Sequence, residues 1–71
     1  MPTSLASRVM EYITEWPMYR IEKFAIDGLG MSEGKIKDLP RPNLLLAIFN
    51  YYQAHPKQAE DFIDLMKTKK M

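Results

Sequence analysis

The chain has 71 residues, 46% of them hydrophobic, and ten Lys and Arg against nine Asp and Glu give a formal net charge of +1. This length suits one domain over residues 1–71 and excludes most enzymes built on a cofactor-binding fold. The charge balance excludes an overall attraction to nucleic acid or to an anionic membrane. Without cysteine and with one histidine, stability must come from apolar packing. We expect a cytoplasmic protein with no membrane segment, because no signal peptide or apolar run of transmembrane length occurs.

Prolines and glycines divide the sequence into segments of helical length. Thr3 or Ser4 can cap a first helix, whose apolar residues return at helical spacing as far as Trp16. Pro17 suits the first turn of a second helix. This helix should end in the segment 28–30, where a glycine can take the left-handed conformation that closes a helix.

Three further helices follow. Ser32 can cap a short third helix that ends near Asp38. The prolines at 40 and 42 then predict an extended or turning link over residues 39–42, so the fourth helix begins at Pro42 or Asn43 and runs to Ala54. Its apolar residues lie nearly all round, which is typical of a helix buried on several sides.

Pro56 restarts the chain, and the apolar residues Ala59, Phe62, Ile63 and Met66 form the stripe of a fifth helix. Residues 67–71 are predicted to be a basic frayed tail. No strand-like alternation occurs, so the predicted fold is all-α: a compact bundle of five helices, with six as the alternative, and the fourth helix at its centre.

The candidate catalytic groups are few. His55 stands beside Pro56 with no cysteine or serine motif to activate, so we expect a surface cap residue. The carboxylates of Glu11 and Glu15 lie at helical spacing, which is typical of a solvated face. The sequence therefore predicts no enzyme, no cofactor and no metal site.

The segment 25–39 resembles a DNA-binding helix-turn-helix, with Gly30 in the turn. In this interpretation Lys35, Lys37 and Arg41 would contact DNA. The third helix is shorter than a usual recognition helix and carries the acidic residues Glu33 and Asp38. The apolar pattern of the segment also fits helix–helix packing equally well. DNA binding is therefore the alternative function, as in a small phage or bacterial regulator.

The same turn supports a second resemblance. Phe24-Ala25, Leu29-Gly30, Ile36 and Leu39-Pro40, followed by the apolar helix over 45–52, look like the death-fold superfamily, in particular the bacterial death-like and effector-associated domains. The sequence departs from relatives at Arg41-Pro42, where they often have glycine after the proline. The resemblance implies association with another protein or another copy, without catalytic residues. The chain would be an adaptor, an inhibitor, a phage-type small protein or one module of a longer effector.

Two charged patches are the candidate contact sites. Tyr19, Arg20 and Lys23 of the second helix could meet Glu60, Asp61 and Asp64 of the fifth helix of a neighbouring copy. Opposite charge on separate surfaces would permit head-to-tail growth. Leu46 falls among polar residues of the fourth helix, so it is either buried beneath another segment or an exposed apolar anchor.

Overall fold

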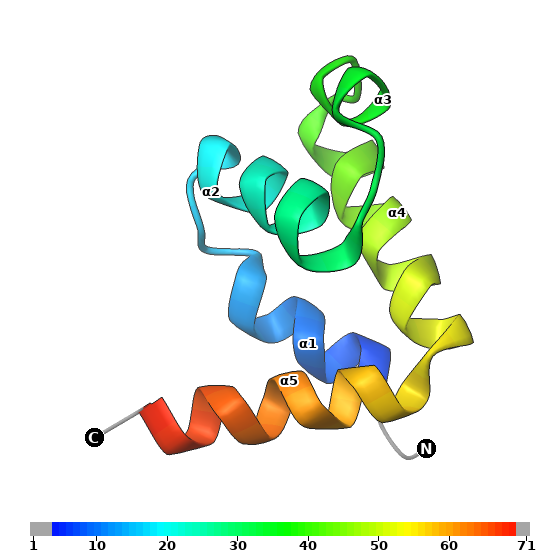
Figure 1. The fold of residues 1–71 in the computed structure, drawn as a ribbon. Coiled ribbons are helices and arrows are strands. Elements are labelled where there is room, and N and C mark those ends of the chain that lie inside the picture. Colours follow the sequence, from blue (N-terminus) through cyan, green and yellow to red (C-terminus); the bar gives the residue numbers. More distant parts are fainter. Residues whose placement is uncertain (1–3, 70–71) are drawn as a thin grey trace.

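The computed structural model describes residues 4–69 (Figure 1). The elements in chain order are α1 (Leu5–Ile13), α2 (Met18–Lys23), the π-helical segment η1 (Phe24–Gly28), α3 (Glu33–Lys37), α4 (Arg41–Ala54) and α5 (Pro56–Lys69). No strand occurs within residues 4–69. The predicted all-α bundle of five helices is confirmed, and η1 continues directly from α2.

Helix α1 begins as the sequence predicts and ends earlier. The Ser4 hydroxyl accepts a hydrogen bond from the Ser7 N–H at 3.1 Å, which caps the helix; Thr3, the other candidate cap, lies outside the described residues. The predicted end at Trp16 is wrong, because α1 stops at Ile13. The Trp16 N–H donates to the Ile13 carbonyl at 3.0 Å in a tight turn, since the following proline disfavours helical geometry at residue 16.

The end of the α2–η1 rod matches the glycine prediction. Gly30 has a φ of 73°, in the left-handed region that favours glycine. The Met31 N–H donates to the Ala25 carbonyl at 3.1 Å and closes the rod. The widening into a π-helix over Phe24–Gly28 was not predicted.

The boundaries of α4 and α5 differ slightly from prediction. Helix α4 begins at Arg41, with Pro40 as its N-cap and Pro42 in its first turn, so the predicted start at Pro42 or Asn43 is wrong by one or two residues. The basic tail predicted for residues 67–71 is also corrected, since α5 continues to Lys69. Residues 70–71 lie outside the described part of the chain.

The core forms where α1 packs against both long helices, α4 and α5 (Figure 1). Helix α1, rather than α4 alone, is therefore the central element. The fully buried side chains include Val9, Ile13, Ile21, Leu44 and Ile48. An aromatic cluster extends this core. The ring centre of Phe62 lies 5.3–6.3 Å from the ring centres of Tyr12, Trp16, Phe24 and Tyr52. The fold is thus held by apolar packing, and none of the buried side chains among the described residues is charged.

None of the helices within residues 4–69 has both the length and the apolar character needed to cross a membrane.

Candidate functional site

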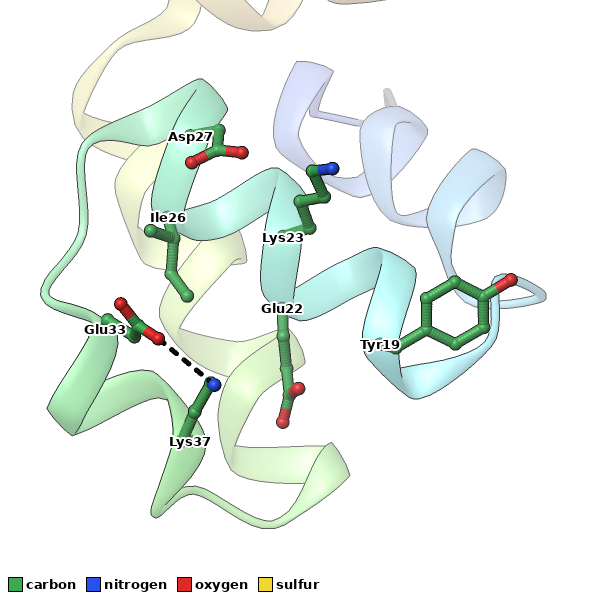
Figure 2. A pocket seen from close by; sticks show the side chains of 7 residues that line it. All are labelled: Tyr19, Glu22, Lys23, Ile26, Asp27, Glu33 and Lys37. Carbon is green, nitrogen blue, oxygen red and sulfur yellow. Dashed lines mark ion pairs between the residues drawn. The ribbon is translucent and has the colours of Figure 1, made fainter.

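The outer face of the α2–η1 rod forms a groove with α3, which we call the α2–α3 groove (Figure 2). Its volume is about 370 Å³. Figure 2 shows Glu22 and Ile26 turned toward Lys37 of α3, while Tyr19 points outward at one end. The residues that line the groove are Tyr19, Glu22, Lys23, Ile26, Asp27, Glu33 and Lys37. The groove thus contains two of the predicted contact residues, Tyr19 and Lys23.

The charges of the α2–α3 groove are mixed, with three carboxylates against two ammonium groups. Lys37 and Glu33 form an ion pair with a 3.1 Å separation between Nζ and Oε2. Both side chains are more than half exposed, so water screens this pair and it stabilises α3 only slightly. The groove has no uniform charge with which to select a strongly acidic or strongly basic partner.

A second hollow lies along the rod, on the side where α2 meets Trp16. The Arg20 guanidinium lies 4.1 Å from the centre of the Trp16 ring, in a cation–π contact. Lys23 and Asp27 line both this hollow and the α2–α3 groove, so the two adjoin at these residues. The lining of this hollow, which we call the Trp16 hollow, is Trp16, Arg20, Lys23, Phe24, Asp27 and Gly28. All three predicted residues of α2 are therefore exposed: Tyr19 lines the α2–α3 groove, Arg20 lines the Trp16 hollow, and Lys23 lines both.

The acidic residues of α5 differ in whether they line a hollow. Glu60, Asp61 and Asp64 are all exposed, as predicted. Only Asp61 lines a hollow with η1, which we call the Asp61 hollow; its lining is Gly28, Leu29, Tyr52, Gln58, Asp61, Phe62 and Leu65. Glu60 adjoins Asp61 in sequence but does not line this hollow, because successive residues of an α-helix point about 100° apart.

Two leucines stand out by their exposure. Leu46 is 57% exposed on α4, which decides against burial beneath another segment. It lines neither the α2–α3 groove nor the two hollows beside η1. Leu65 is 51% exposed on α5 and lines the Asp61 hollow. The sequence analysis did not single out Leu65. The available signal was that this leucine lies outside the apolar stripe of α5.

The three basic residues of the DNA-binding alternative have different environments. Arg41 serves the fold: its Nη2 donates to the Trp16 carbonyl at 3.0 Å and also to the Thr14 carbonyl. Lys37 is paired with Glu33. Lys35 is exposed, on a helix of only five residues. The structure thus ties two of the three residues to neighbouring groups of the same chain.

His55, the one histidine of the chain, makes its contacts on the surface at the end of α4. His55 is the C-cap of α4; its Nδ1 lies 2.8 Å from the Tyr51 carbonyl oxygen, and its ring stacks on that of Tyr51 at 4.4 Å. His55 is therefore the surface cap that the sequence predicts. Among residues 4–68, no three His, Asp or Glu side chains come close enough together to hold a metal ion.

Comparison with protein-family models, with curated proteins and with solved structures gives no match to this chain.

Proposed function

We propose that this chain is a non-enzymatic protein–protein interaction module, a small adaptor that binds its partner through exposed helix faces. The observation that carries the proposal is the outer face of the α2–η1 rod, where Tyr19 is 74% exposed beside Arg20 and Lys23. Tyrosine and arginine are among the residues that protein interfaces favour, and Lys23 adds positive charge beside them. Grooves on both sides of the rod add concave surface next to these groups.

The core favours the same proposal. Its buried side chains carry no charge in the described part of the chain. The groups available for recognition are therefore on the surface, which suits binding rather than chemistry in an enclosed site.

The death-like resemblance belongs to this proposal. It is supported by an all-helical bundle in which a glycine turn and a short helix precede two long helices, α4 and α5. By that resemblance the module would recruit an effector in a bacterial or phage system. We propose the cytoplasm as its compartment, because a cysteine-free bundle held by apolar packing needs no oxidising environment.

The proposal is tested by affinity capture from an extract of the source cells, using the whole chain as bait. The variant carries Arg20→Glu and Lys23→Glu, and the matched control carries Lys35→Glu and Lys57→Glu, which change the charge equally at exposed positions that line neither the α2–α3 groove nor the Trp16 hollow. We expect the unmodified chain and the control to retain the same proteins, including added copies of the chain itself, and the variant to lose them. Identical retention by all three baits contradicts the proposal.

A further inference from the structure

The Trp16 hollow and the Asp61 hollow adjoin one another. Gly28 lines both. Phe24 lines one and Phe62 the other, and their ring centres are 5.3 Å apart. The two hollows therefore form one continuous surface from α2 across η1 to α5, which we call the Gly28 face.

The Gly28 face carries opposite charges at its two ends. Arg20 and Lys23 stand at the α2 end, where Asp27 offsets part of their positive charge. Asp61 stands at the α5 end. These side chains are exposed, and within residues 4–68 the only ion pair joins Lys37 to Glu33 elsewhere on the surface. Both ends of the face are thus open to charges from outside the chain.

The middle of the Gly28 face is apolar. Leu65 is 51% exposed there, and Leu29 is half-buried beside it. Gly28 itself adds no side chain, so the surface stays hollow at the point where the two halves meet. An apolar centre with charged groups at the rim is the anatomy of a protein interface.

We propose that two copies of this chain bind each other through the Gly28 face about a two-fold axis, with Arg20 and Lys23 of each copy facing Asp61 of the other. This inference rests on the proposed function and names its partner. A face that is positive at one end and negative at the other is complementary to a second copy of itself rotated by 180°. Each charge contact then forms twice, as an isologous interface requires.

The same geometry argues against the head-to-tail growth that the sequence alone suggests. Growth of that kind needs the basic and acidic patches on separate faces. Because the two hollows adjoin at Gly28, we expect a copy that buries an interface of ordinary size over one hollow to cover the other as well. A stable contact takes about 800 Å² from each copy, which is about a sixth of the 5019 Å² accessible surface. We therefore expect closure at two copies, with the exposed flanks of α2 and α5 contributing to the contact.

The test is sedimentation velocity on the whole chain over a wide concentration range, at about 0.05 M and about 0.5 M salt. We expect the mass to level off at twice 8.3 kDa. The dimer should weaken at the higher salt, since its charges lie at the rim. A monomer at every concentration in low salt overturns this inference; if the capture experiment still distinguishes the baits, the proposed function stands with an unlike partner. Mass that grows beyond two copies overturns the two-fold arrangement.

Adjacent residues of α5 supply the matched variants. Asp61→Lys should raise the dissociation constant at least about tenfold, because an attraction becomes a repulsion at two symmetric places. Glu60→Lys makes the same charge change outside the Asp61 hollow and should leave the dimer intact. Lys23→Glu should also weaken self-association, and an equimolar mixture of the Lys23→Glu and Asp61→Lys chains should restore a one-to-one dimer. Equal effects of Glu60→Lys and Asp61→Lys, or no rescue by mixing, overturn the proposed contacts.

The apolar centre is tested by Leu65→Ser. This exposed residue contributes little to the core, so the variant should keep the parent helix content while its dimer dissociates more readily. Leu46→Ser is the control, since Leu46 is equally apolar and exposed but lies outside the Gly28 face. If Leu65→Ser keeps both its helix content and the self-association of the parent chain, the apolar centre is not part of the interface.

Discussion

The guanidinium of Arg41 donates to the carbonyl oxygen of Trp16 across 25 residues of sequence, with 3.0 Å between Nη2 and O. The same nitrogen donates to the carbonyl of Thr14. These two carbonyls follow the early end of α1, where the helix offers them no N–H partners. Arg41, the first residue of α4, therefore satisfies carbonyls at the C-terminal end of α1 and links the two helices.

We predict that Arg41→Met destabilises the fold by about 1–3 kcal/mol, because it leaves the part-buried Trp16 carbonyl and the exposed Thr14 carbonyl without their charged donor while keeping a side chain of similar length. Lys35→Met is the control: this exposed residue should change the free energy of unfolding by less than about 0.5 kcal/mol. Urea unfolding followed by circular dichroism measures both. Equal free energies of unfolding for the two variants would show that Arg41 has no structural role. Arg41 would then again be a candidate DNA contact.

Phe62 is the side chain on which the aromatic cluster depends. It is 7% exposed and contacts rings from α1, from the turn after α1, from η1 and from α4. Phe62→Ala should cost about 3–5 kcal/mol, which is comparable to the whole stability of a small domain at about 0.05–0.15 kcal/mol per residue. Ile48→Ala, at a fully buried position, should cost about 2–5 kcal/mol. Thermal melting of both variants next to Leu46→Ala checks this; a Phe62→Ala melt that coincides with the Leu46→Ala melt would contradict the core assignment.

Two glycines should respond to the same substitution with opposite sign. Gly30 has a φ of 73° and open space around its missing Cβ, so Gly30→Ala introduces backbone strain without a clash and should cost about 1–2 kcal/mol. Gly34 lies within α3, also in open space, so Gly34→Ala should stabilise the fold by about 0.5–1 kcal/mol. The free energies of unfolding of the two variants, measured in urea, give the comparison. A stabilising Gly30→Ala would show that the turn does not need the left-handed conformation.

Tyr52 should make the folded state less stable at alkaline pH. Burial, with a further contribution from the neighbouring Tyr51, raises the pKa of Tyr52 from 10.0 to about 12. The folded state therefore binds the phenolic proton more tightly than the unfolded state. This stabilisation is complete below pH 10.0 and is lost as the pH rises toward about 12.

Within that window we expect the Tyr52 contribution to the free energy of unfolding to fall by up to about 1.4 kcal/mol per pH unit. Tyr52→Phe should flatten this part of the pH dependence, whereas Tyr19→Phe, at a 74% exposed position, should keep the parent slope. Urea unfolding at several pH values below and inside the window measures the slopes. The same slope for Tyr52→Phe and for the parent chain would show that Tyr52 is not its cause.

Features that depend on local chemistry could be predicted from the sequence. The Ser4 cap and the left-handed Gly30 are set by a few neighbouring residues. The early end of α1 has a local cause in Pro17, which disfavours helical geometry at Trp16. The packing of the Trp16 ring against Phe24 and Phe62 could not be predicted, because those rings lie on other elements. The role of Arg41 was missed for the same reason, since its acceptors lie on another element.

The candidate site shows the same division. The exposure of Tyr19 and of the acidic residues of α5 follows from helical periodicity. The separation of Asp61 from Glu60 depends on how α5 is rotated against η1, and this rotation is set by tertiary packing. Helical spacing finds which residues are exposed, and only the packed structure shows which of them share a face.

Trp16 is the one tryptophan of the chain, and it is half-buried between the Arg20 guanidinium and the Phe24 ring. Its indole lines the hollow at the α2 end of the Gly28 face. Fluorescence from this single position therefore reports two events without an added label: unfolding exposes the indole to water, whereas a second copy seated over Arg20 shields it further. Opposite shifts of the emission maximum separate loss of the fold from binding, so each variant can be followed in one optical titration.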